Sequence, residues 1–328
     1  MFTINKPFLL HAITSVHAGS GSEIGNVDLP IQREKHTAYP KVESSSLKGS
    51  LRQNIASSVG NDPVAHADFS VVFGSAPKDT DSNESVASAL SFLDARILLF
   101  PVKSLKGTFA WITCPHVLQR FNREMTLLNP ISADKLGHLL LEVGEPGTVS
   151  GSALVAHHKE KNGDEEKLIV LEEYTFKVRQ SDKAEQLARK LEDWVLENET
   201  PIGITERLVI LSDDEFANFV KLSTEVNARI RVEDNGQVDG GLWYEENVPP
   251  ETIFYSAILI GQVRAPQKSS KASRDGNNDM NRSELKSAQD VQNYVNEHFP
   301  TVFQLGGSNT IGRGIMRNIW IKGGNSHE

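Results

Sequence analysis

The sequence predicts an α+β fold, and three features support this. Apolar runs rich in β-branched and aromatic residues recur along the 328 residues, amphipathic helical segments separate them, and no repeat of about 20 to 50 residues indicates a solenoid. Hydrophobic residues make up 38% and charged residues 23%, with 24 glycines and 14 prolines, which is typical of a globular chain with many turns. The length allows one large domain with insertions or two modest ones.

Composition also excludes several classes of protein. No apolar run reaches the roughly 20 residues that span a bilayer, and the N-terminus lacks a signal-peptide pattern, so we expect no membrane association and a cytoplasmic location. Cys114 is the single cysteine, which rules out an internal disulfide, and we expect it to be a buried hydrophobe. The net charge of −9 argues against a free-standing, sequence-blind nucleic-acid binder but leaves room for a local basic surface.

The first third of the chain reads as strand, loop, helix and loop. Residues 8–17 are apolar and β-prone and lead into a glycine-rich loop, 17–34. Residues 44–59 are a helix with an apolar stripe at Leu47, Leu51 and Ile55. Lys48 and Arg52 share a second face, where they either bind phosphate beside the serine-rich helix start or are two solvated surface cations. Residues 60–90 read as a loop or lid with little core.

The middle of the chain alternates strands and helices. Residues 91–102 and 107–114 are β-prone, and Pro115 begins an amphipathic helix. An acidic helical insertion is expected over 150–200, followed by a helix with a capping box, Ser212 and Glu215. The alternating run 227–233 predicts a half-buried strand with Arg229 and Arg231 on its outer face.

The last third contains a projecting arm and a glycine-rich end. Residues 234–256 resemble a hairpin whose Trp243 either stacks on bases or plugs the base of the hairpin itself. A central strand follows at 253–263, then a low-complexity segment, 266–283, that we expect to be mobile, and a helix over 284–299. The glycine motifs at either end of the chain fit neither a P-loop nor a Rossmann loop, because no helix follows them. They suit backbone approach to an extended polyanion such as RNA.

Taken together, the motifs resemble a known family. HAGSG, VDLPIQREKHT, SSLKGSLR, LDARILLFPVKSLKGTFAWIT and GGSNTIGRG, in this order, are similar to the RAMP superfamily and, more narrowly, to the repeated backbone subunit of the type III-B CRISPR effector, the Cmr complex. The resemblance extends from about residue 5 to about residue 320. It implies one domain over 1–328, with a modified ferredoxin-like (RRM-like) core, a lid-like insertion at 60–90 and a thumb hairpin at 234–256.

The resemblance also implies a function. Such a subunit polymerises along the guide RNA with copies of itself and with other Cmr subunits, including the large and small ones. Inside that complex it acts as an endoribonuclease, cutting bound single-stranded target RNA at six-nucleotide intervals with a divalent metal, magnesium or manganese. Two alternatives stay open: a purely structural guide-binding subunit, and an endoribonuclease that processes the guide.

Site residues follow from the same resemblance. Asp28 is implied as the catalytic carboxylate and metal ligand, with His17 donating a proton or orienting phosphate, and with Glu245 and Tyr244 approaching from the thumb of a neighbouring subunit. The expected RNA-binding residues are Gly19, Gly21, Ser46, Lys48, Arg52, Trp243, Gly306, Gly307, Thr310 and Arg313.

Overall fold

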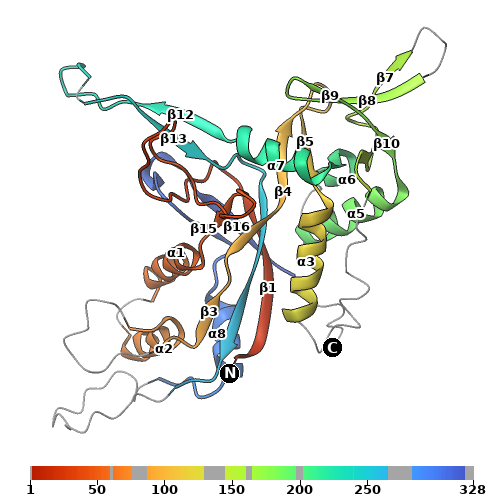
Figure 1. Cartoon of the computed structure of the whole chain (residues 1–328). Helices are drawn as coiled ribbons and strands as arrows, with labels where there is room; N and C mark the ends of the chain where they lie inside the picture. Colours follow the sequence, from red (N-terminus) through yellow and green to blue (C-terminus); the bar gives the residue numbers. More distant parts are fainter. Residues whose placement is uncertain are drawn as a thin grey trace, which may run out of the picture.

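The α+β prediction is confirmed. The computed structural model describes residues 2–59, 62–75, 87–128, 145–159, 165–196, 202–238, 240–264 and 283–321. One long mixed sheet runs through the molecule with helices packed against it, and a narrow two-stranded arm projects from one end (Figure 1). Among these residues, no helix is both long and apolar enough to cross a membrane.

The core has the expected ferredoxin-like order. Along the chain its elements are β1 (Phe2–Ala12), α1 (Ser44–Ala56), β4 (Ala95–Lys103), β14 (Ile253–Gly261), α8 (Ala288–His298) and β16 (Ile315–Trp320). In space the strands lie in the order β4-β14-β1-β16, and every neighbouring pair is antiparallel. This is the split β-α-β-β-α-β arrangement, in which each helix joins two strands that are not adjacent.

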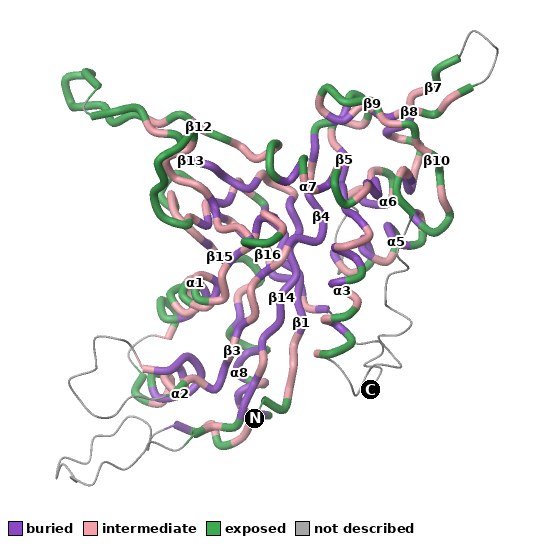
Figure 2. The backbone as a smooth tube through the Cα atoms, viewed as in Figure 1, coloured by how far each residue is buried: buried purple, intermediate pink, exposed green. Residues whose placement is uncertain are grey.

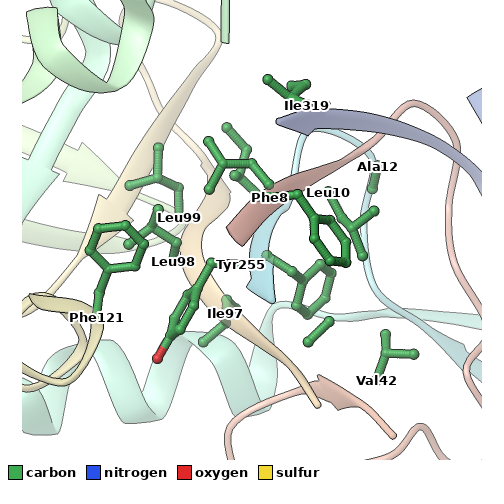
Figure 3. Close-up of a cluster of buried hydrophobic side chains, with 14 of the residues drawn as sticks. Phe8, Leu10, Ala12, Val42, Ile97, Leu98, Leu99, Phe121, Tyr255 and Ile319 are labelled. Carbon is green, nitrogen blue, oxygen red and sulfur yellow. The ribbon is translucent and has the colours of Figure 1, made fainter. Parts of the chain in front are cut away.

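Burial explains why these strands form the centre. β14 is an almost continuous apolar run, and eight of its nine residues are buried, because helices and loops cover both faces of the sheet. Figure 2 shows the same pattern, with the buried backbone concentrated along β1, β4 and β14. Phe8, Leu10 and Ile97 lie on one face of these strands, and Tyr255 lies on the other face, where its ring packs edge-on against Phe121 with centroids 5.0 Å apart (Figure 3). Full burial of each such apolar side chain stabilises the folded state by roughly 1.5–3 kcal/mol relative to leaving it exposed.

The remaining elements are short strands and helices around this core. They are β2 (Lys41–Val42), α2 (Pro63–Phe73), β3 (Leu90–Phe92), β5 (Phe109–Thr113), α3 (Pro115–Leu128), β6 (Thr148–Val149), β7 (Ala156–Lys159), β8 (Glu165–Leu171), β9 (Tyr174–Lys177), β10 (Arg179–Gln180), α5 (Asp182–Leu196), α6 (Ile204–Arg207), β11 (Leu208–Ile210), α7 (Asp213–Leu222), β12 (Glu225–Arg229), β13 (Trp243–Asn247), β15 (Val302–Gln304) and the 3₁₀ turn η4 (Asn309–Ile311). Everything from β5 to β13 is inserted between the core strands β4 and β14.

Three expectations within this insertion have clear outcomes. The helix at Pro115 and the capping box of Ser212 with Glu215 are confirmed. Cys114 is buried as expected, and burial raises the pKa of its thiol to about 12, so the sulfur stays protonated. The acidic helical insertion over 150–200 is corrected: a three-stranded sheet, β7-β8-β9, comes before its helix α5.

The expectation of a loop with little core at 60–90 is wrong for residues 63–73. These form α2, which buries Phe69 and Phe73, and the Phe73 ring stacks on Phe299 with centroids 6.5 Å apart. Serine and aspartate in this stretch suggested a loop, but Asp62 caps the helix instead. Residues 76–86 and most of the 266–283 segment lie outside the described residues.

The structure contains a projecting thumb hairpin, but its residue bounds differ from the predicted ones. β12 pairs with β13, Arg229 facing Trp243 and Glu225 facing Asn247, so the hairpin spans 225–247 rather than 234–256. Residues 253–256 belong to the core strand β14. The predicted basic outer face holds for Arg231, which is exposed, but not for Arg229. Arg229 turns inward toward a buried carboxylate, while Ile230 and Val232 are half-exposed on the arm.

Candidate functional site

β13, at the base of the thumb, organises the site. One edge of this strand pairs with β12. The other edge holds the glycine-rich loop: the amides of Asp28 and Leu29 donate to the Tyr244 carbonyl at 3.1 and 3.0 Å, and the Glu246 amide donates to the Leu29 carbonyl at 3.0 Å. The loop therefore acts as a third strand beside the hairpin, and Asp28 stands where it joins.

The Asp28 side chain is held by the same edge. Its Oδ2 accepts a hydrogen bond from the Tyr244 amide at 2.7 Å. Within the described part of the chain, Oδ1 accepts no hydrogen bond, and the residue is half-exposed. Asp28 is thus both a structural residue of the loop and a carboxylate with one oxygen open to a ligand.

His17 occupies the next position along this edge. Its Nδ1 lies 2.7 Å from the Glu246 carbonyl oxygen, so Nδ1 carries the hydrogen of this bond. Nε2 is then the nitrogen left for other chemistry. Tyr244 binds Asp28 and Glu246 binds His17. Because these two residues are two apart on a strand, their backbone positions are about 7 Å apart.

Glycines pack around His17, which revises their expected role. A Cβ on Gly19 would lie 2.7 Å from His17 Nε2, and a Cβ on Gly307 would lie 3.2 Å from its Cδ2. A Cβ on Gly306 would lie 2.3 Å from the His17 carbonyl oxygen. These three glycines make room for the histidine. Of the four glycines predicted to bind RNA, only Gly21 is exposed with open space around its Cβ position, which leaves its backbone accessible to RNA.

Glu245 does not reach a neighbouring subunit, contrary to the prediction. The residue is 2% exposed, and its carboxylate binds Arg229 Nη1 at 2.5 Å and lies 3.2 Å from Arg313 Nη1. Ser308 Oγ donates to it from the terminal glycine loop at 3.2 Å. Arg313 therefore serves an internal ion pair, whereas Thr310, on the adjoining turn, is exposed.

Several charges act on the Glu245 carboxyl. Burial works to raise its pKa, but the hydrogen bond from Arg229 and the charges of His17, Arg229 and Arg313 outweigh burial and lower it. The group is therefore ionised at neutral pH, and a buried ionised carboxylate with two guanidinium partners serves better as an anchor than as a base.

The two thumb aromatics point to different roles. The guanidinium carbon of Arg229 lies 5.6 Å from the centre of the Trp243 ring, which is half-buried at the base of the hairpin. This favours the alternative in which Trp243 packs against its own hairpin. Tyr244 is 38% exposed on the opposite face, next to the Asp28 loop. Tyr244 is thus the aromatic available to a bound strand.

Gln32, a residue that the sequence reasoning missed, connects helix α1 to this loop. Gln32 Nε2 donates to the Gly19 carbonyl and to Ser46 Oγ, both at 3.0 Å, and its Oε1 accepts from the Glu43 amide at 2.7 Å. Gln32 thereby ties the start of α1 to the glycine-rich loop. No sequence signal identifies this glutamine, because its partners lie 11 to 14 residues away, beyond the spacing of any helix or strand pattern.

One backbone amide at the start of α1, where the serines predict phosphate binding, is already occupied. The Ser44 amide already donates to Asp94 Oδ1 at 2.9 Å. Lys48 Nζ contacts the Leu90 carbonyl at 3.3 Å, and Arg52 contacts the Ser75 carbonyl at 3.4 Å. Burial, and then the charge of Arg52, lowers the pKa of Lys48. Among the described residues, neither cation pairs with a carboxylate. Both are therefore available to bind an anion such as phosphate.

The donor set does not fit a metal site built by the protein. Within the described residues, no group of three or more histidine, cysteine, aspartate or glutamate side chains could hold an ion. Asp28 offers a single open oxygen. Magnesium commonly keeps several waters and binds through one or two carboxylates plus substrate phosphates. Any metal here would take most of its ligands from RNA and water.

Known proteins share this architecture. A sequence model of the RAMP superfamily matches residues 9–317. The CRISPR system Cmr endoribonuclease Cmr4 of Pyrococcus furiosus is 34% identical over 94% of this chain and 92% of its own length. The CRISPR system CMR subunit Cmr4 of Saccharolobus solfataricus is 26% identical over 79% of this chain and 85% of its own length.

Solved structures agree with the sequence matches. Oligomeric Cmr4 from Pyrococcus furiosus matches with a TM-score of 0.60 and 26% identity, over 97% of this chain and 98% of that chain. A chain of the type III-B Cmr-beta complex bound to cognate target RNA has the same fold, with a TM-score of 0.66, 23% identity and coverage of 97% and 98%. With its ferredoxin-like core, its thumb and these matches, the chain belongs to the RAMP superfamily.

Proposed function

We propose that this chain is the repeated backbone subunit of a type III-B CRISPR effector in the cytoplasm, and that it cleaves bound target RNA at six-nucleotide intervals. The observation that carries the proposal is the placement of Asp28 and His17 on one edge of β13, at the base of an arm that projects from the body. The 34% identical relative is named an endoribonuclease. The partners proposed for this chain are the guide RNA, the target RNA, copies of itself and the other Cmr subunits.

The chemistry uses the ribose beside the scissile phosphate. Asp28 Oδ1 accepts the proton of the 2′-hydroxyl while the ribose 2′-oxygen forms a bond to phosphorus. The bond from phosphorus to the 5′-oxygen breaks, and His17 Nε2, when protonated, donates to that oxygen. The products carry a cyclic phosphate and a 5′-hydroxyl. Each proton transfer contributes roughly 10²- to 10⁴-fold to the rate.

Alternatively, Asp28 would use its one open oxygen as the carboxylate ligand of a magnesium or manganese ion, whose other ligands would be RNA phosphate oxygens and water. Such an ion would stabilise negative charge on the reacting phosphate. The target-cleavage assay, run with and without EDTA, tests this requirement, and undiminished cleavage in EDTA would remove the metal from the proposal.

The alternatives make different predictions in the same assay. A purely structural subunit would leave cleavage unaffected by Asp28→Asn in the assembled complex. An enzyme that processes the guide would cut repeat RNA as an isolated chain. No contact in the described residues favours either alternative, whereas the open Asp28 oxygen beside His17 favours target cleavage.

Guide binding by α1 gives one testable prediction. Replacing Lys48 with methionine keeps the aliphatic stem and removes a charge that no carboxylate in the described residues neutralises. Guide assembly should weaken for every guide sequence, because phosphate contacts position the strand without reading bases. The slope of log affinity against log salt should become shallower by about 0.7. Filter binding across a salt series measures both.

Lys41 provides the matched control. Its Nζ lies 2.6 Å from Glu43 and 3.1 Å from Asp94, so its charge is already neutralised. Lys41→Met should leave the salt slope unchanged. Equal effects of the two substitutions, or a loss limited to some guide sequences, would refute a phosphate contact by Lys48.

The thumb gives a second prediction. Its projecting part, residues 230–242, carries half-exposed aliphatic side chains that nothing in the described chain covers, namely Ile230, Val232, Val238 and Leu242. Exposed apolar clusters mark contact surfaces, and apolar side chains can wedge between bases. Replacing residues 230–242 with Asn-Gly would join Arg229 to its partner Trp243 through a two-residue turn and keep the site intact.

This trimmed thumb should abolish the regular spacing of cuts while leaving guide binding in place. Sequencing the fragment ends of a long target measures the spacing. The control replaces only the turn residue Asn235 with serine, which should change nothing. Cuts that keep their spacing after trimming would show that the arm does not set the interval.

A further inference from the structure

Glu246 contacts the segments that hold Asp28 and His17, the two catalytic candidates, and it was not itself predicted as a site residue. It neighbours Glu245 on β13, so the two side chains point to opposite faces of the hairpin. Glu245 meets the terminal glycine loop, whereas Glu246 turns toward the loop that carries Asp28. The residue is 6% exposed and charged, and a buried charge needs partners that the fold must supply.

Three partners surround the Glu246 carboxylate. Oε2 accepts from the Ile31 amide at 3.1 Å. Oε1 accepts from Arg33 Nη2 at 2.5 Å and from Thr224 Oγ1 at 2.7 Å. Ile31 and Arg33 lie just beyond Asp28 in the same loop, and Thr224 precedes β12. The carboxylate thus fastens the loop to the base of the thumb.

The backbone of the same residue holds both catalytic candidates. Its amide donates to the Leu29 carbonyl at 3.0 Å, one residue beyond Asp28. Its carbonyl accepts from His17 Nδ1 at 2.7 Å, which leaves Nε2 facing away from the strand. A shift of Glu246 would therefore move Asp28 and His17 together.

We infer that Glu246 is a positioning residue for the cleavage reaction: its carboxylate sets the place of the Asp28 loop and, through the strand backbone, the direction of His17. The inference rests on the proposed function, because it concerns the same reaction. A displacement of about 1 Å in a catalytic group can lower a rate by roughly 10²-fold, so a positioning residue can have a large effect without touching RNA.

The test is Glu246→Gln in the reconstituted complex, assayed at saturating target. Glutamine keeps one acceptor oxygen, but it presents an amide to Arg33 or to the Ile31 amide and loses the ion pair. The single-turnover cleavage rate should fall roughly 10- to 100-fold, whereas target affinity and guide assembly should stay within about twofold. The double variant with Arg33→Gln should be slowed by less than the product of the two single effects, because the two residues share one contact.

The matched control is Glu225→Gln, which changes a carboxylate of the same hairpin that binds Ser15 rather than the catalytic loop. It should leave the cleavage rate unchanged. A wild-type rate for Glu246→Gln would overturn the inference, as would a loss of target affinity equal to the loss of rate. If Asp28→Asn also cuts at the wild-type rate, the proposed function itself fails; if only Glu246→Gln does, the positioning role alone fails.

Discussion

Asp28→Asn is expected to slow target cleavage by the assembled complex by roughly 10²- to 10⁴-fold. Asparagine has nearly the same shape, and its side-chain oxygen can still accept the Tyr244 amide that binds Oδ2. It cannot take up a proton as a carboxylate does. Single-turnover assays on a labelled target give the rate, and the guide content of the purified complex reports whether assembly is unaffected.

Asp213→Asn is a suitable control for this substitution. Asp213 lies at the start of α7, where it accepts from the His116 amide at 2.9 Å, and an asparagine oxygen can do the same. The control complex should cut at the wild-type rate. Equal rates for the two variants would mean that the carboxylate of Asp28 takes no part in cleavage.

Gly306→Ala is expected to lower the stability of the fold strongly. At this position φ is +89°, and a Cβ would lie 2.3 Å from the His17 carbonyl oxygen, a backbone atom that cannot rotate away. The left-handed strain and the overlap together should lower the free energy of unfolding by roughly 3 kcal/mol. Denaturant unfolding of the isolated chain measures this loss.

Gly312→Ala separates strain from overlap. Its φ is +79°, but nothing lies within 4 Å of the added Cβ, so only the conformational cost remains, roughly 1 kcal/mol. The two variants should therefore differ by about 2 kcal/mol. Equal losses would show that the contact between the terminal glycine loop and His17 does not form in solution.

The core was predictable because its signals are local. The runs that became β4, β5 and β14 are apolar and β-prone, and the caps of α7 follow from residues three apart. α2 was missed because serine and aspartate near its ends resemble a loop, whereas Phe69 and Phe73 are buried by contacts made elsewhere in the chain.

The site was predictable only in part, for a related reason. The resemblance pointed to Asp28, His17 and the glycines, and the fold brings them together. Period-two alternation placed Arg229 outside, but its inward turn depends on Glu245, sixteen residues later in the chain. Contacts such as those of Gln32 and Glu246 join distant segments, and no single-sequence pattern encodes them.

The central claim is that one Asp28 in each copy makes one cut, and complexes doped with Asp28→Asn chains test it most directly. Wild-type and variant chains are mixed in known ratios before assembly, and the amplitude at each cut site is measured on one target. The amplitude should fall in proportion to the variant fraction at every site and vanish when all copies are substituted, while the spacing stays constant. Cuts at the same positions and with full amplitude in the fully substituted complex would contradict the claim.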